Sequence, residues 1–78
     1  MKKIVSQLEQ LQRLDSLIKR KATGSPMELA TRLKVSKRTV YNLIDTLKLL
    51  GAEVTYDNLR ESYIYENDFT FRFEIGNG

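Results

Sequence analysis

A run of hydroxyl and cationic side chains, Ser36-Lys37-Arg38-Thr39, carries the most specific chemistry in this sequence. The planar guanidinium of Arg38 can donate two parallel hydrogen bonds to a phosphate or to O6 and N7 of guanine. Ser36 is of the residue type that caps helices, so the run is expected to form a first helical turn, whose free backbone N–H groups favour an anion. The run therefore predicts binding of a polyanion. The plainer alternative is that Ser36 only caps the helix and Arg38 is a solvated surface charge.

Five further side chains extend this candidate site. Tyr41 can stack on a sugar or donate to a phosphate, and Asn42 can pair bidentately with adenine. We expect phosphate contacts at the edges of the patch from Lys34 and Lys48, and a minor-groove contact from Arg60. The sequence leaves open that Tyr41 is an ordinary surface tyrosine and that Asn42 contacts no base.

The composition gives little support for catalysis. The 78 residues include no cysteine and no histidine, which removes the usual metal ligands and the usual acid–base group near neutral pH. The sequence has no glycine-rich phosphate loop, and its acidic residues are scattered. We therefore expect no enzyme activity, no cofactor, no metal site and no small-molecule ligand.

The distribution of apolar and charged residues indicates where a partner would bind. No apolar run approaches the roughly 18 residues of a membrane span, and the N-terminus lacks the apolar core of a signal peptide, so we expect a cytoplasmic protein. Residues 1–51 hold eleven Lys and Arg against four Asp and Glu, a net charge of +7, whereas residues 52–78 hold two against six, a net charge of −4. This asymmetry predicts that a polyanion docks on the N-terminal part.

Three helices are expected to position these side chains. Residues 2–22 repeat apolar side chains every three or four residues, and Gly24 follows as a stop. The second helix begins after a capping box, Ser25-Pro26-Met27-Glu28, and the third begins at Ser36 and ends at Gly51. The predicted buried faces are Ile4, Leu8, Leu11, Leu14, Leu17 and Ile18 in the first helix, Met27, Leu29, Ala30 and Leu33 in the second, and Val40, Leu43, Ile44, Leu47 and Leu50 in the third.

After Gly51 the apolar period changes from 3.6 to 2, which predicts strands. Residues 53–56 and 63–65 alternate around a loop at 57–62, and residues 69–75 form a further amphipathic strand. Three helices followed by a hairpin are the plan of a winged helix-turn-helix. The expected fold is therefore α+β and a single domain over residues 1–78, with the helix-turn-helix at 25–51, the wing at 53–66 and an extra C-terminal strand.

Residues 13–66 resemble the N-terminal winged-helix domain of bacterial transcription regulators of the WYL-domain type and, more loosely, the DNA-binding domain of biotin-ligase repressors. The resemblance implies that Ser36, Arg38 and Thr39 meet phosphates or base edges at the start of a recognition helix. Where relatives commonly carry an Arg-Asp pair, this chain has Asn42-Leu43, so one expected DNA contact is lost. The matching segments are Arg13-Leu14, Glu28-Leu29-Ala30, Leu33, Val35-Ser36-Lys37-Arg38-Thr39-Val40-Tyr41, Ile44, Leu47, Leu50-Gly51-Ala52, Tyr56-Asp57 and Ser62-Tyr63-Ile64-Tyr65.

The two segments outside the resemblance are apolar on one face. The extension at residues 1–12 and the strand at residues 69–75 are expected to form a homodimer seam, with packing inside one chain as the alternative. The predicted seam residues are Ile4, Leu8, Leu11, Phe69, Phe71 and Phe73.

The sequence therefore predicts a transcription regulator that binds double-stranded DNA in a sequence-dependent way, as a homodimer on a two-fold site. Two alternatives stay open: a protein–protein interaction module on a winged-helix scaffold, and an accessory DNA-binding protein of a phage or mobile element.

Overall fold

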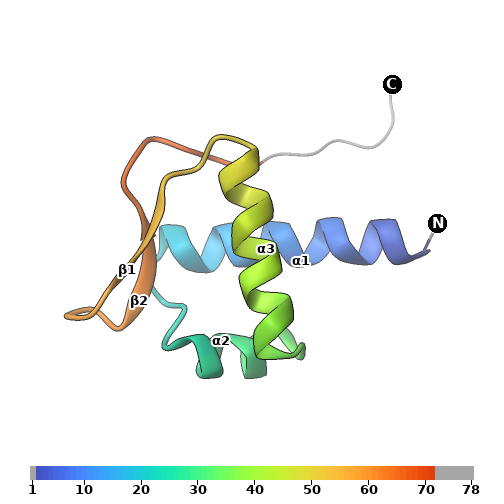
Figure 1. Ribbon diagram of the computed structural model, residues 1–78, viewed down its shortest axis with the longest axis horizontal. Helices are drawn as coiled ribbons and strands as arrows, with labels where there is room; N and C mark the ends of the chain where they lie inside the picture. Colours follow the sequence, from blue (N-terminus) through green and yellow to red (C-terminus); the bar gives the residue numbers. More distant parts are fainter. Residues whose placement is uncertain (1, 72–78) are drawn as a thin grey trace.

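The computed structural model describes residues 2–71, with side chains from Gln7 onwards. It contains three helices, α1 (Lys2–Lys19), α2 (Pro26–Leu33) and α3 (Lys37–Leu49), followed by two strands, β1 (Val54–Asp57) and β2 (Ser62–Tyr65) (Figure 1). The strands pair antiparallel as a hairpin. This arrangement confirms the predicted α+β winged helix-turn-helix.

Both helices of the helix-turn-helix begin at the predicted caps. At the start of α2 the Ser25 hydroxyl accepts from the Glu28 N–H (3.2 Å), while the Glu28 carboxylate accepts from the Ser25 N–H (2.8 Å). At the start of α3 the Ser36 hydroxyl accepts from the Thr39 N–H (3.1 Å). Each bond satisfies a donor that a helix start otherwise leaves free, which fixes where the two helices begin.

The corner between α2 and α3 is tight because one residue adopts a left-handed conformation. Lys34 has φ 59° and ψ 45°, and the next N–H, that of Val35, donates to the Ala30 carbonyl (3.0 Å). Val35 packs against the core, as expected for the residue before the cap. The corner thus places the start of α3 close in space to the end of α2.

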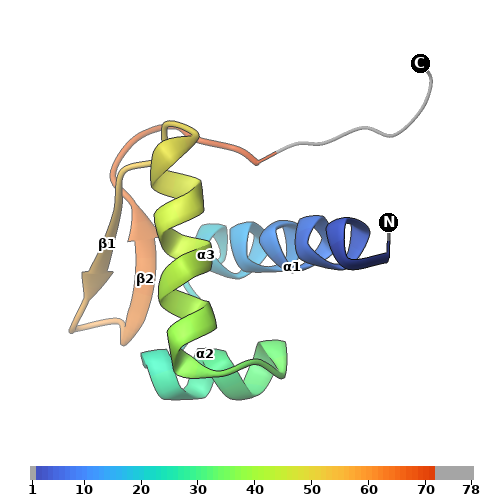
Figure 2. The ribbon, with the colours of Figure 1, turned by 45° about the vertical axis from the view of Figure 1, so that its right-hand side comes forward.

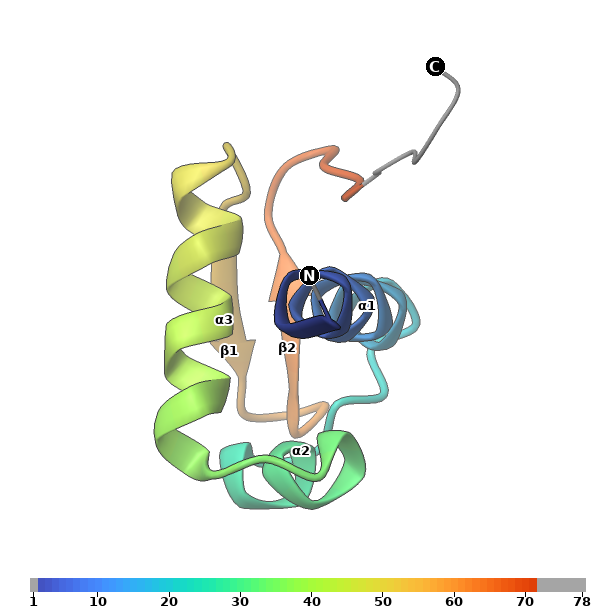
Figure 3. The ribbon, with the colours of Figure 1, turned by 90° about the vertical axis from the view of Figure 1, so that its right-hand side faces the viewer.

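The helices surround one core and the hairpin closes it at one end. Helix α3 crosses in front of α1, and α2 lies below both (Figures 1 and 2). In the hairpin, β2 packs against α1 and β1 against α3 (Figure 3). The fully or nearly buried apolar side chains are Leu11, Leu14, Ile18, Leu29, Ala30, Leu33, Val40, Leu43, Ile44, Leu47, Ala52, Tyr63 and Phe71.

A buried polar cluster fastens the hairpin to the connection between α1 and α2. Thr23 and Ser62 are both fully buried. The Thr23 N–H donates to the Ser62 hydroxyl (3.1 Å), and the Tyr63 N–H donates to the Thr23 hydroxyl (2.9 Å). Because buried polar groups are costly unless they are paired, these bonds hold β2 in one position relative to the helices.

Two side chains predicted to be buried are exposed. Met27 is 68% exposed because it lies in the first turn of α2, on the side that faces away from the core. Leu50 is 53% exposed because it is the C-cap of α3, with φ −84° and ψ 0°, so the helical period no longer determines where its side chain lies. The first helix also ends earlier than predicted, at Lys19, and Lys21 has a positive φ of 55°.

The predicted strand at residues 69–75 is wrong for its described part. Phe69–Phe71 form no strand, and residues 72–75 lie outside the described residues. The Phe71 N–H donates to the carboxylate of Asp15 (3.2 Å), and the Phe69 ring packs edge-on against Tyr65, with ring centroids 5.2 Å apart. Alternating side chains predict a strand only where a neighbouring strand is available, and here α1 is the neighbour.

Several residues of the predicted dimer seam belong to the core of the single chain. Leu11 (5% exposed) and Phe71 (8%) are buried within the single chain, and Leu8 and Phe69 pack against the same core. Packing within one chain therefore holds for these described side chains. Phe73 and the side chain of Ile4 lie outside the described part of the chain.

Candidate nucleic-acid interface

The solvent side of α3 presents a stripe opposite its buried residues. Val40, Leu43, Ile44 and Leu47 face the core, and at 100° per residue the opposite side is formed by four exposed residues. We call these the outward stripe of α3: Arg38, Asn42, Asp45 and Leu49. Only the first half of this stripe can bind an anion, because Asp45 is acidic and Leu49 apolar.

The N-terminal turn of α3 joins a cap, a cation and free amides. The first intrahelical bond runs from the Val40 N–H to the Ser36 carbonyl (3.1 Å), so the N–H groups of Lys37 and Arg38 precede it. The Ser36 and Thr39 hydroxyls also lie 3.0 Å apart. Lys37 and Arg38 are exposed. This turn is a suitable place for a phosphate or the edge of a base.

Two of the remaining predicted residues, Lys34 and Tyr41, lie around this turn, and a third, Lys48, lies at the other end of α3. Lys34 is exposed in the corner before it, and Lys48 is exposed in the last turn of α3. Tyr41 is 45% exposed, one turn after Lys37. The structure therefore places Lys34, Tyr41 and the start of α3 in one region, with Lys48 at the far end of the helix.

Three tyrosines lie near one another where α3 meets the wing, and of these only Tyr41 was predicted as a site residue. Tyr56 and Tyr63 face each other across the hairpin, with ring centroids 5.1 Å apart. Burial raises the pKa of Tyr63, and the neighbouring hydroxyls of Tyr41 and Tyr56 raise it further. The hydroxyl of Tyr63 therefore stays protonated at neutral pH. Its position opposite Tyr56 was visible in the alternation of the hairpin, but its proximity to α3 was not.

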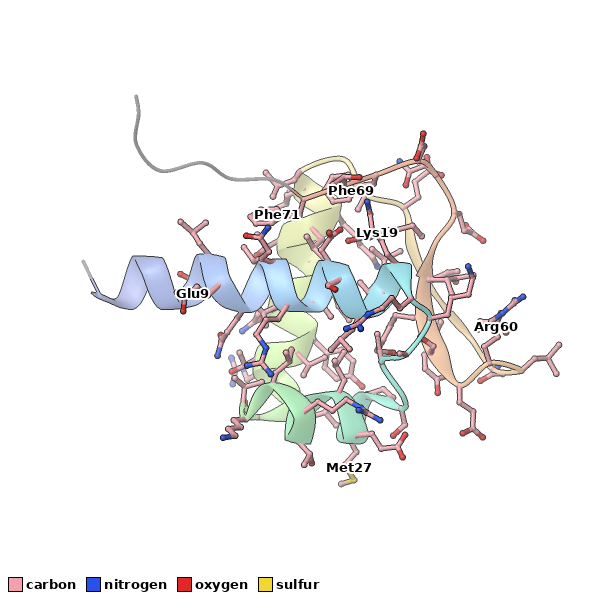
Figure 4. The ribbon with its side chains drawn as sticks, turned by 180° about the vertical axis from the view of Figure 1, so that it is seen from behind. Glu9, Lys19, Met27, Arg60, Phe69 and Phe71 are labelled. Atoms are coloured by element: carbon pink, nitrogen blue, oxygen red, sulfur yellow. The ribbon has the colours of Figure 1, made fainter. Side chains whose placement is uncertain are left out.

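At the tip of the wing, the positive charge of Arg60 is paired with a neighbouring carboxylate. Arg60 donates from Nη1 to the carboxylate of Asp57 (2.9 Å), the one salt bridge among residues 7–71. The same carboxylate accepts from the N–H groups of Leu59 (2.9 Å) and Arg60 (3.3 Å). The hydrogen bond from Arg60 lowers the pKa of Asp57, so the pair is charged at neutral pH. Figure 4 shows Arg60 at the end of the hairpin, where Leu59, which was not among the predicted site residues, is 97% exposed.

A hollow between α2 and the wing limits where DNA can lie. Its volume is about 510 Å³, and two carboxylates, those of Glu28 and Glu61, line it together with Tyr56 and exposed Met27. Negative charge on both walls repels a phosphate backbone. Between α3 and the wing, the surface suited to a polyanion is therefore limited to the start of α3 and its neighbours.

The described part of the chain holds neither a candidate metal centre nor a candidate membrane span. Residues 7–71 contain no group of three His, Cys, Asp or Glu side chains that could hold a metal ion. Among residues 2–71, no helix combines the length and the apolar character required to cross a membrane.

The architecture and this exposed helix start define a winged helix-turn-helix. The family model HTH_11, described as an HTH domain, matches residues 2–60 of the 78. The chain belongs to this family, a winged helix-turn-helix family found in regulators of the WYL and biotin-ligase types, and DNA binding is the class of function that an HTH domain implies. Neither a curated protein nor a solved structure matches the chain significantly.

Proposed function

We propose that this protein binds double-stranded DNA in a sequence-dependent way and regulates transcription, with α3 as the recognition helix in the major groove. The observation that carries the proposal is the placement of Arg38 and Asn42. Both are exposed, one turn apart on the outward stripe, beside the capped start of α3. In helix-turn-helix proteins the N-terminal residues of the second helix are those that contact base edges.

The proposed contacts divide into two kinds. Arg38 and Asn42 read bases, because an arginine fork fits guanine and an asparagine amide fits adenine. Ser36, Lys37 and Thr39 hold a phosphate at the helix start, which fixes the register but carries no sequence information. Flanking phosphates would be contacted by Lys34, Tyr41 and Lys48, and Arg60 would enter the minor groove once released from Asp57.

The test is selection from a random duplex library at about 100 mM salt, where non-specific binding is weakened. The wild type is expected to enrich a motif that Arg38→Ala no longer enriches. Arg38→Lys is the matched control, since it keeps the charge and loses the fork. If Arg38→Lys enriches the same motif as the wild type, Arg38 contacts a phosphate. If the wild type enriches nothing, sequence-dependent binding is wrong.

A homodimer is part of the proposal. Its support is the N-terminal half of α1, which projects beyond α2 and α3 (Figures 1 and 2). Because Leu11 and Phe71 are used inside one chain, the seam would rest on the projecting part of α1. A dimer on DNA would give two half-sites spaced by about 34 Å, one helical turn. Sedimentation equilibrium and the spacing of the selected motif test it, with Ile4→Glu, a change at a predicted seam residue near the start of α1, as the disrupting variant.

One observation favours a second candidate, a protein-docking module. The acidic hollow between α2 and the wing, with Met27 at its edge, suits a basic protein segment better than DNA. Arg38→Ala distinguishes the two functions, because it should abolish DNA affinity and leave partner binding intact.

A regulator of transcription would act in the cytoplasm of a bacterial cell.

A further inference from the structure

The outer face of α1 carries a second cationic surface, on the side of the domain away from α3. Arg13 and Arg20 are exposed and lie seven residues apart, so both project from the same side of the helix. Leu14 and Ile18, on the other side of α1, are buried in the core. Arg13 and Arg20 therefore point away from the core that α1 shares with α3.

The surface around these arginines is shaped as well as charged. Arg13, Ser16, Leu17 and Arg20 line a shallow hollow of about 160 Å³. Arg13 donates from Nη2 to the backbone carbonyl of Arg32 (3.2 Å), which brings this guanidinium over the last turn of α2. We call Arg13, Arg20 and Arg32 the rear arginine surface.

Negative charge near the rear arginine surface is limited. Within residues 7–71 no carboxylate forms a salt bridge with Arg13, Arg20 or Arg32. Glu9, one turn before Arg13, lies on the outer side of α1 (Figure 4). Glu28, one turn before Arg32, accepts from the backbone N–H of Ser25. The surface as a whole has an excess of positive charge.

The two cationic surfaces lie on opposite sides of a thin molecule. The domain measures 41 × 27 × 19 Å, and Figures 1 and 4 view it along the shortest axis from its two sides. In Figure 1 α3 is in front of α1, and in Figure 4 α1 is in front. A duplex on α3 therefore leaves the outer face of α1 accessible.

We infer that the rear arginine surface binds the phosphates of a second DNA duplex, so that one domain bridges two DNA segments. The inference rests on the proposed DNA binding by α3. Guanidinium groups suit phosphate oxygens, and seven residues of helix separate Arg13 from Arg20 by about 10.5 Å along the axis. Along the duplex axis each strand carries one phosphate per about 3.4 Å, so two guanidinium groups at this separation can each reach a phosphate. The contact is to the backbone and is independent of sequence.

A bridging assay tests the inference. Beads carrying duplex A are saturated with protein, washed, and incubated with a fluorescent duplex B, and the recovered B is measured. The test variant is Arg13→Gln/Arg20→Gln, which keeps most of each side-chain length and a donor for the Arg32 carbonyl. The control is Lys2→Gln/Lys3→Gln, which removes the same charge from the start of α1. Affinity for duplex A alone is measured by fluorescence anisotropy.

The wild type and the control are expected to recover duplex B. The test variant should recover at least fivefold less, with its Kd for duplex A changed by less than threefold. Failure of the wild type to recover B on saturated beads overturns the inference and leaves the proposed function intact. Equal recovery by the test variant also overturns it, since bridging would then come from a dimer. Failure of the wild type to bind duplex A counts against the proposed function itself.

Discussion

At the scale of single residues, Ser36 has two duties that can be separated. Its hydroxyl caps α3 through the Thr39 N–H, and the same turn is the proposed phosphate site. Ser36→Ala removes the cap and should lower the free energy of unfolding by about 1 kcal/mol. Ser36→Asp keeps a capping oxygen but adds a negative charge, so it should preserve stability and weaken DNA binding. Urea denaturation and fluorescence anisotropy measure the two effects, and a stable Asp variant with unchanged affinity would rule out the phosphate contact.

Substitution of Lys34 by glycine should raise the stability of the fold and lower the affinity for DNA. Lys34 holds a left-handed conformation, which is unfavourable for any residue with a Cβ and natural for glycine. Lys34→Gly is expected to stabilise the fold by up to about 1 kcal/mol, after allowing for the greater freedom of glycine in the unfolded chain. The same change removes a cation at the edge of the interface and should weaken DNA binding. Lys34→Ala is the control, because it removes the charge and keeps the strain.

Residue types alone located the caps and the exposed start of α3, because both depend on neighbours close in the sequence. They did not reveal that Arg60 is paired with Asp57, since that bond depends on how the hairpin turns at its tip. The same limit applies to Tyr63, whose neighbour Tyr41 is on another element. Local chemistry is therefore readable from sequence, whereas the available charge of a side chain depends on its partners.

At the scale of elements, the wing keeps Arg60 in an ion pair with Asp57, away from any DNA contact. The pKa of Asp57 is lowered in the fold, so its contribution to stability is present above the ordinary carboxyl pKa near 4 and is lost as the pH falls through the lowered value. At neutral pH the pair with Arg60 is therefore formed. Asp57→Asn keeps the oxygen that accepts from the Leu59 and Arg60 N–H groups but loses the charge.

This change should release Arg60 for DNA. We expect Asp57→Asn to tighten DNA binding and to steepen the log–log salt slope by about 0.9, the value for one added phosphate contact. Salt titration by anisotropy measures it. The double variant Asp57→Asn/Arg60→Gln should return to the wild-type slope, and an unchanged slope in Asp57→Asn alone would show that the released Arg60 does not reach the DNA.

The attachment of the wing depends on Thr23. Thr23→Ala leaves the Tyr63 N–H and the Ser62 hydroxyl without this buried partner, which should lower the free energy of unfolding by about 1–3 kcal/mol. Thr31→Ala is the matched control, because the Thr31 hydroxyl is exposed and only donates to the carbonyl one turn before it. Thermal denaturation compares the two, and equal losses would mean that the Thr23 cluster does not hold the wing.

Helices with caps and a hairpin with a clear alternation were predicted within a few residues of their observed limits. The C-terminal strand was not, although its alternation is as regular as that of the hairpin. The difference is that Phe71 is held by Asp15, a residue 56 positions earlier. A pattern determines which side chains share a face, but not which distant group takes up the backbone N–H.

At the scale of the whole molecule, the interface around α3 predicts a strong dependence on salt. About five phosphates neutralised by the start of α3 and its flanking lysines would give a log–log slope near −4 to −5. Titrating a short duplex that fits one domain from about 50 to 300 mM salt measures it. A slope near zero would place the binding energy elsewhere than in phosphate contacts.

The described fold reaches further along the chain than the family match, which ends at residue 60 in the tip of the hairpin. Asp15 accepts from both the Tyr65 hydroxyl (2.6 Å) and the Phe71 N–H, while Lys19 donates to the hydroxyl of Thr70. Hydrogen bonds therefore hold the segment after the wing, residues 66–71, across α1. A fusion or deletion that cuts within this segment would separate Phe71 from the core and expose Asp15, so any heterologous module should be joined after residue 71.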